Sequence, residues 1–235
     1  MPVRHALVTG ANRGLGLEFV RQLLARGDRV VATCRHPGKA TALNALAGEH
    51  PGRLHVLPLD VADPRAITEL QRELALLADD DERLDLLVNG AGVLHSGERF
   101  GRVGAANLDD SFRTNAMGPF LLTQALAPRL ADGARVANIT SQLGSIAATN
   151  RFGTPSYAIS KAAQNMATAQ LAAALRPRGI VVVALHPGWV QTDMGGSGAT
   201  VSPQESVDGL LRVIDGLGDA DSGRFLDWRG QSLPW

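Results

Sequence analysis

The sequence predicts an α/β fold: a doubly wound parallel sheet of about seven strands, with helices on both faces, in a single domain over residues 1–235. Short β-branched runs alternate with longer segments of helical period, which is typical of repeated βαβ units. The strand runs are almost continuously apolar, as expected of a parallel sheet buried on both faces. The length fits one large domain, and no linker or internal repeat interrupts the alternation.

The elements follow in order along the chain. Strands are expected over residues 5–9, 29–34, 53–59, 84–89, 134–140, 179–185 and 223–228. Helices are expected over residues 15–27, 63–79, 107–130, 156–175 and 202–217. Gly27 ends the first helix as a C′ glycine, and Asp63 with Pro64 forms a typical helix start. The acidic run over 79–82 is expected to be a solvated loop.

Charge and composition exclude several classes of function. Lys plus Arg and Asp plus Glu both number 23, so the zero net charge argues against binding to nucleic acid or to an anionic membrane. A single cysteine, Cys34, rules out an internal disulfide. No long apolar segment indicates a signal peptide or a membrane span, so a cytoplasmic location is expected. The six scattered histidines show no metal-ligand spacing, so no metal site is expected.

The stretch TGANRGLG, residues 9–16, indicates a phosphate site. Gly10, Gly14 and Gly16 occupy the predicted turn between the first strand and the first helix. Without side chains there, a pyrophosphate can approach the free N–H groups at the helix start. The alternative is an ordinary glycine-rich turn. A doubly wound parallel sheet with such a loop after its first strand is Rossmann-like.

The end of the second strand favours NADP(H) over NAD(H). An NAD site usually places Asp or Glu there, but this strand ends in Thr33, Cys34 and Arg35. Arg35 and the loop residue Arg13 are suited to clamp a 2′-phosphate with their forked donors. Alternatively, both are solvated surface arginines.

Tyr157 and Lys161 lie one helical turn apart in YAISK, so they project from one helix face. Tyr157 is the only tyrosine, and Lys161 is one of two lysines in an arginine-rich chain. A phenol is a poor proton-transfer group at neutral pH unless a neighbouring cation stabilises its anion. The pair therefore indicates proton-transfer chemistry, whereas a half-buried tyrosine beside a surface lysine is the structural alternative.

The motifs together resemble the short-chain dehydrogenase/reductase family over the whole chain. The resemblance rests on TGANRGLG (9–16), LDV (59–61), NGAG (89–92), Asn115 in RTNAMG, ITS (139–141), YAISK (157–161) and HPGWVQTDM (186–194). Their details are most similar to the subgroup of Sniffer-type carbonyl reductases and C-factor-like proteins. The resemblance implies NADPH-dependent reduction of a carbonyl to an alcohol, or the reverse.

It also implies a catalytic set of four residues. Tyr157 is the proton donor, Lys161 lowers its pKa and holds the nicotinamide ribose, Ser141 hydrogen-bonds the substrate oxygen, and Asn115 seats a water. The expected cofactor contacts are Gly10, Asn12, Arg13, Gly14, Leu15, Gly16, Arg35, Asp60, Val61, Asn89, Ala91, Gly92, Tyr157, Lys161, Pro187, Gly188, Val190 and Thr192.

Two departures from the family pattern bear on these roles. Gly90 stands where the family has a second asparagine, which predicts a more flexible loop with the Asn89 contact retained. An apparent insertion between Ser141 and Tyr157 makes Ser145 a rival for the catalytic serine. Ser141 fits the end of the fifth strand better.

The expected partners are a small-molecule carbonyl or alcohol and further copies of the chain, as a homodimer or homotetramer. The apolar faces of the helices that carry Asn115 and Tyr157 suggest this pairing. The loops 93–106, 142–155 and 193–203 would set the substrate.

The sequence leaves two alternative functions: a dinucleotide-binding sensor or signalling protein without turnover, and a sugar-nucleotide epimerase or dehydratase. The intact catalytic set argues against the first, and the short chain after Trp189 against the second.

Overall fold

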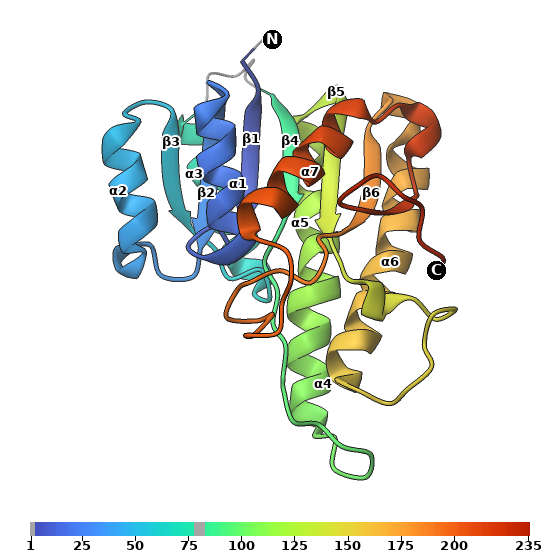
Figure 1. The fold of residues 1–235 in the computed structure, drawn as a ribbon. Coiled ribbons are helices and arrows are strands. Elements are labelled where there is room, and N and C mark those ends of the chain that lie inside the picture. The colour runs from blue at the N-terminus through green and yellow to red at the C-terminus, as the bar shows by residue number, and fades with distance from the viewer. Residues whose placement is uncertain (1–2, 78–82) are drawn as a thin grey trace.

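A computed structural model describes residues 3–77 and 83–235 and shows the predicted fold. All seven strands form one parallel sheet in the order β3-β2-β1-β4-β5-β6-β7 (Figure 1). The strands are β1 (His5–Thr9), β2 (Arg29–Cys34), β3 (Leu54–Pro58), β4 (Leu84–Asn89), β5 (Leu130–Ile139), β6 (Val181–His186) and β7 (Phe225–Asp227). The result is a single-domain, Rossmann-like α/β fold.

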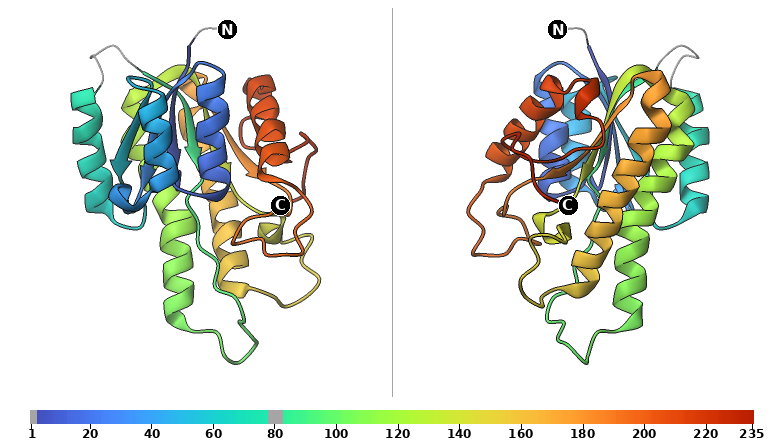
Figure 2. Two further views of the ribbon diagram at one scale, coloured as in Figure 1. Left: turned by 60° about the vertical axis from the view of Figure 1, so that its left-hand side comes forward. Right: turned by 90° about the vertical axis from the view of Figure 1, so that its right-hand side faces the viewer.

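Helices cover both faces of this sheet (Figure 2). On one face lie α1 (Gly14–Ala25), α2 (Thr41–Glu49) and α7 (Pro203–Gly216). On the other lie α3 (Pro64–Leu77), α5 (Gly118–Leu126) and α6 (Pro155–Leu175), while α4 (Ala105–Phe112) continues into α5. The connections are those of right-handed βαβ units.

The buried strands explain why the sheet has two cores. In β1, Leu7 packs into the core with α3, α5 and α6, whereas Ala6 and Val8 pack into the core with α1, α2 and α7. Successive side chains of a strand point to opposite faces, so a strand buried on both sides must be apolar throughout. The continuous apolar runs of the sequence follow from this requirement.

The carboxyl edge of the sheet carries the long connections. The α4–α5 unit and the first turns of α6 extend beyond this edge, together with the loops that follow β4, β5 and β6 (Figure 2). The chain leaves β1 toward β2 on one side and reaches β4 on the other, which makes this point the topological switch. A ligand site is expected there.

Several element boundaries differ from the predicted ones. The helix predicted over 107–130 is interrupted by a π-helical segment, Arg113–Met117, and ends at Leu126, and β5 begins already at Leu130. Helix α2 was not predicted, because only Leu43 of this short helix is buried and its apolar periodicity is weak. Residues 78–82, which include the predicted end of α3 and the acidic run, lie outside the described residues.

Candidate active site

The glycine loop joins β1 to α1 as predicted. Gly10 has a φ of +65°, a conformation that favours glycine. A Cβ on Gly16 would lie 2.3 Å from the Gly10 carbonyl oxygen, so the loop can fold back on α1 only without that side chain. The N-cap residue Arg13 provides no side-chain cap for α1. The first N–H groups of the helix are therefore left for another acceptor.

The loop after β6 lies against this glycine loop. Arg13 forms an ion pair with Asp193 at 3.1 Å, and both side chains are mostly exposed. A Cβ on Gly14 would meet Thr192 at 3.4 Å. The structure thus brings the glycine loop together with the loop after β6, which are the first and the last segments of the chain predicted to contact the cofactor.

The rest of that set is distributed along the same edge. Arg35 follows β2 and is exposed. Asp60 accepts a hydrogen bond from the Ala62 N–H at 3.0 Å in the turn after β3, and Val61 is buried. Further members of the predicted cofactor set follow β1, β4 and β6: Asn12, Leu15, Ala91, Pro187, Gly188 and Val190.

The loop after β4 is hydrogen-bonded to the end of β1. The Thr9 hydroxyl accepts hydrogen bonds from the N–H groups of Gly90 at 3.0 Å and Ala91 at 3.1 Å. A Cβ on Gly90 would lie 2.9 Å from the Thr9 carbonyl oxygen. Glycine is therefore the residue that lets this loop pack on β1, and the expected flexibility of the loop stays a prediction.

The Asn89 side chain points into the molecule. It is buried, and its amide donates to Asn138 at 2.8 Å and Thr123 at 3.1 Å. It therefore connects β4 to β5 and α5 inside the molecule. A cofactor contact by this side chain is not supported, and a backbone contact stays a prediction.

Tyr157 and Ser141 meet at the carboxyl end of β5. Ser141 lies two residues beyond the end of β5. Its hydroxyl forms a hydrogen bond with Tyr157 and accepts another from the Leu143 N–H at 3.1 Å. Ser145 is buried nearby, and its hydroxyl accepts from the Ala148 N–H at 3.1 Å within its own loop. Of the two serines, Ser141 is thus the one hydrogen-bonded to Tyr157.

Lys161 is buried on the same face of α6. Its ammonium donates to the Ile139 carbonyl oxygen at 2.8 Å and to Gln164 Oε1 at 2.9 Å, and lies 5.6 Å from the centre of the Tyr157 ring. Burial lowers the pKa of Lys161 to about 7. Gly92 lies beside it, since a Cβ there would be 3.8 Å from the Lys161 nitrogen.

Burial dominates the protonation of Tyr157. It raises the pKa of Tyr157 to about 12, and the hydrogen bond with Ser141 lowers this pKa only in part. The Lys161 ammonium donates to Ile139 and Gln164, and its expected lowering of the Tyr157 pKa stays a prediction. The phenol is consequently protonated at neutral pH, which is the form that a proton donor needs.

Asn115 lies in the π-helical segment between α4 and α5. Its side chain accepts from the Val93 N–H at 2.8 Å and donates to the Val93 carbonyl at 2.9 Å and to Ser160 Oγ at 2.9 Å. Extra residues in a helical turn of this kind often occur at functional sites. The side chain thus ties the β4 loop to α6, and the water it is expected to seat stays a prediction.

Two residues of this region were not predicted. Glu98 accepts hydrogen bonds from the Ser156 N–H at 3.1 Å and hydroxyl at 2.8 Å at the start of α6. These bonds, with one from Asn107, lower the pKa of Glu98, while partial burial opposes the shift. Gln164 binds Lys161. Its position three residues after that lysine, among apolar residues, is the signal that could have found it.

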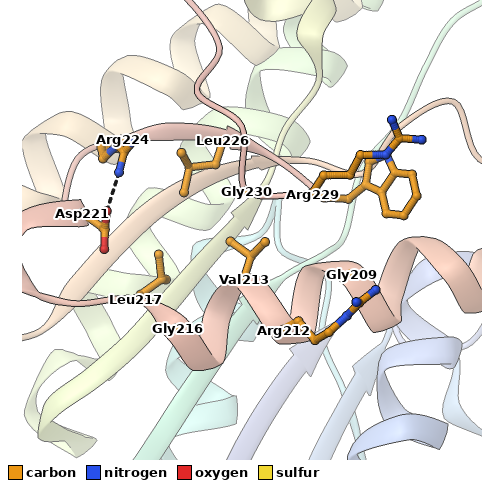
Figure 3. A pocket seen from close by; sticks show the side chains of 11 residues that line it. Gly209, Arg212, Val213, Gly216, Leu217, Asp221, Arg224, Leu226, Arg229 and Gly230 are labelled. Carbon is orange, nitrogen blue, oxygen red and sulfur yellow. Dashed lines mark hydrogen bonds and ion pairs between the residues drawn. The ribbon is translucent and has the colours of Figure 1, made fainter.

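A separate cavity of about 430 Å³ lies between α7 and the segment around β7 (Figure 3). None of the predicted site residues lines it. Arg224 pairs with Asp221 at 2.5 Å, and Arg229 stacks on Trp228.

Among the residues that the structure describes, no cluster of three or more His, Cys, Asp or Glu could hold a metal ion. Within the same ranges no helix is both long and apolar enough to cross a membrane.

Residues 4–200 match the family model described as short chain dehydrogenase. The chain belongs to the short-chain dehydrogenase/reductase family. Membership accounts for the motif order from the glycine loop to YAISK and agrees with the predicted resemblance.

Individual proteins refine this assignment. The chain is 49% identical to the C-signal of Myxococcus xanthus over 154 residues, which is 65% of this chain and 93% of the relative. The NADPH-bound carbonyl reductase from chicken fatty liver is 40% identical, with complete coverage of both chains and a TM-score of 0.94. The carbonyl reductase Sniffer of D. melanogaster is 34% identical, covers 99% of this chain and 100% of its own, and also has a TM-score of 0.94. These similarities confirm the predicted subgroup.

Proposed function

We propose that the protein is an NADPH-dependent reductase that converts an aldehyde, ketone or quinone to an alcohol, or catalyses the reverse reaction. The observation that carries this proposal is the hydrogen bond between Tyr157 and Ser141, with the Lys161 ammonium 5.6 Å from the tyrosine ring. Ser141 follows the end of β5, Tyr157 and Lys161 lie on α6, and the three side chains meet at the carboxyl edge of the sheet, where open α/β sheets bind ligands.

The residues at the switch point fit a dinucleotide phosphate. Gly10 and Gly16 let the loop pack closely on Ala91 and on its own backbone, and α1 begins there without a side-chain cap, so its first N–H groups can receive a phosphate. Arg35 is exposed at the end of β2, where no carboxylate competes for a 2′-phosphate. The Arg13–Asp193 ion pair is exposed and therefore weak, so Arg13 can exchange its partner for phosphate. NADPH, when bound, supplies the hydride for the carbonyl carbon.

The side chains then supply the proton and the orientation. Ser141 donates a hydrogen bond to the substrate oxygen and holds it against the Tyr157 hydroxyl. Tyr157, protonated at neutral pH, gives its proton to that oxygen as the alcohol forms. The adjacent Lys161 ammonium stabilises the resulting phenolate by its charge. Asn115 fixes the β4 loop against α6 and so preserves the arrangement.

The rim of the site favours a substrate with apolar parts. Phe100 and Phe152 contact each other edge to face at 5.7 Å, and so join two of the loops expected to set the substrate. Trp189 and Met194 are further exposed apolar side chains on the loop after β6. The substrate itself and the cytoplasmic location stay predictions.

A second candidate function is signalling without turnover. The observation that favours it is the 49% identity to a protein named C-signal. The same fold can host many functions, so this identity alone does not decide. The Tyr157–Ser141 pair argues for turnover, because a protein that only binds a dinucleotide has no use for a proton donor.

The deciding experiment measures NADPH and NADH oxidation with a panel of aldehydes, ketones and quinones, for the wild type and Tyr157→Phe. We expect turnover with NADPH and a loss of about 10²-fold or more in the variant, since general acid catalysis contributes on that scale. NADPH affinity, followed by nicotinamide fluorescence, should change little. Tight NADPH binding without turnover of any carbonyl by the wild type would instead favour the signalling function.

A further inference from the structure

We propose that Gln164 is a positioning residue for this reaction: its amide oxygen holds the Lys161 ammonium in place and keeps it charged. The inference rests on the proposed function and deepens it. Gln164 belongs to none of the motifs that carry the family resemblance. It acts through Lys161 and not on the substrate.

The hydrogen-bond geometry of Lys161 is the first support. An ammonium has three donors and no acceptor. Two donors are used, by the Ile139 carbonyl at 2.8 Å and by Gln164 Oε1 at 2.9 Å. One donor is left for the reacting side, so the two acceptors fix the direction in which it points.

The second support is the burial of Gln164 itself. The residue is fully buried, and its Nε2 has no hydrogen-bond partner among the described residues. A buried amide with an unpaired donor costs free energy, and an apolar residue at this position would avoid that cost. Since an ammonium only donates, the amide must present its oxygen to Lys161 and cannot turn over to satisfy its nitrogen.

The third support is the rigid attachment of this helical turn to the sheet. Thr168 donates to the Gln164 carbonyl at 2.9 Å, and Asn138 of β5 donates to Thr168 at 2.8 Å. Ile139, the other acceptor of Lys161, is the next residue of β5. Both acceptors are thus held on one framework.

The electrostatic setting explains why a neutral acceptor matters. The groups in contact with the Lys161 ammonium are the Ile139 carbonyl, the Gln164 amide and the ring of Tyr157, and Tyr157 is the ionisable one among them. No carboxylate among the described residues pairs with Lys161, so hydrogen bonds to its charged form oppose the effect of burial. A carboxylate at position 164 should therefore favour the ammonium, and an apolar side chain should disfavour it.

The composition of the chain permits a direct test. Lys39 and Lys161 are its two lysines, so protein labelled with 13Cε-lysine should give two lysine resonances, assigned with Lys39→Arg. We expect Gln164→Glu to raise the measured pKa of Lys161 by about one unit or more, and Gln164→Leu to lower it. Gln164→Met, which is close to glutamine in shape, repeats the apolar test if the leucine variant does not fold. Lys39 is the internal reference.

Gln170→Glu is the matched control, because it adds the same charge at an exposed position of α6. An unchanged Lys161 titration in Gln164→Glu and in the apolar variant would overturn the proposal. So would a shift in the same direction in both. This readout needs no turnover, so it stands even if the protein proves not to be a reductase.

The second readout is the pH dependence of kcat/KM for NADPH-dependent reduction. Because the charged form of Lys161 is the active one, the alkaline limb should move to higher pH in Gln164→Glu and to lower pH in Gln164→Leu or Gln164→Met. A merely structural role would lower the rate without moving the limb. NMR shifts without any turnover in the wild type would support the Gln164–Lys161 interaction and contradict the reductase function.

Discussion

At the residue scale, the choice between two serines shows how placement defines a role. Ser141 and Ser145 are both buried near the end of β5, and either hydroxyl could polarise a substrate oxygen. Their partners separate them. Ser141 hydrogen-bonds Tyr157, whereas Ser145 accepts from the Ala148 N–H of its own loop.

We expect Ser141→Ala to lower kcat by about 10²-fold, because a donor aimed at the reacting oxygen contributes on that scale. Ser145→Ala should retain activity within a few-fold. The measurement is steady-state reduction of the best carbonyl substrate at saturating NADPH. Loss of activity in Ser145→Ala with full activity in Ser141→Ala would reverse the assignment.

Lys161 should make stability depend on pH. Burial lowers its pKa to about 7 from an ordinary value of 10.5, so between these values the unfolded chain binds the proton and the folded chain does not. The free energy of unfolding therefore rises with pH across this window, by at most about 1.4 kcal/mol per unit from this group.

Lys161→Met removes the ionisable group and with it this pH dependence. The difference in the free energy of unfolding between the variant and the wild type should therefore be greatest at about pH 7 and shrink toward pH 10. Urea unfolding of both proteins at several pH values measures the difference. A difference that does not vary with pH would contradict the buried, shifted lysine. The variant should also lose reductase activity, so the measurement separates the effect of Lys161 on stability from its role in the reaction.

Arg35 should decide the preference between cofactors. We expect Arg35→Asp to shift the ratio of kcat/KM from NADPH toward NADH by about 10-fold or more, since a charged hydrogen bond to phosphate is lost and a like charge is introduced. Arg72→Asp, at an exposed position of α3, is the control for net charge. An unchanged ratio in Arg35→Asp would mean that this arginine is an ordinary surface residue.

At the element scale, close packing of short turns on long helices positions the site. The 3₁₀ turn Gln142–Gly144 lies between Ser141 and the loop of Ser145 and packs directly on α6. A Cβ on Gly144 would lie 2.7 Å from the Lys161 carbonyl carbon and 2.9 Å from the Ala162 nitrogen. Both are backbone atoms of a helix, so neither can move aside cheaply.

Gly144→Ala should therefore push this turn away from α6 and separate Ser141 from Tyr157. We expect a loss of stability of about 1–3 kcal/mol, as for other overpacked sites, and a fall in kcat. Gly153→Ala in the same connection is the matched control, because a Cβ there meets nothing within 4 Å. Equal stability and activity of the two variants would show that the turn does not position the site.

At the scale of the whole molecule, the outer surfaces of α4 and α6 carry exposed apolar side chains. Phe112 of α4 and Ile159 and Met166 of α6 are about half exposed or more, at 49%, 56% and 62%. These two helices pack against each other and project beyond the sheet. The surface is consistent with the predicted homodimer or homotetramer.

We expect the wild type to sediment as a dimer or tetramer and the double variant Ile159→Glu/Met166→Glu to shift toward the monomer, because buried charges oppose association. Leu76→Glu, at an exposed apolar position of α3, should leave the mass unchanged. A strictly monomeric wild type in analytical ultracentrifugation would remove the prediction.

Much of this architecture could be predicted because it depends on local pattern. The apolar runs of β1 and β6 are continuous since both faces of the sheet are covered. Helix α1 ends at Ala25 with Arg26 as its C-cap, and Gly27 follows with a φ of +91°, as expected of a C′ glycine. The glycine loop and the YAISK spacing also identify themselves in one stretch of chain. The boundaries of β5 and the weakly amphipathic α2 were missed, because packing against distant elements sets them.

The fold class, the glycine loop after β1 and the Tyr157–Lys161 pair could be predicted from the sequence alone, since period and spacing are properties of contiguous residues. Only the tertiary structure decided which serine meets Tyr157, where the Asn89 side chain lies, and which residue binds Lys161. These are questions of burial and of contacts between β4, β5 and α6, whose residues are far apart in the chain. The protonation of a side chain follows the same rule, because its pKa depends on the surroundings that folding assembles.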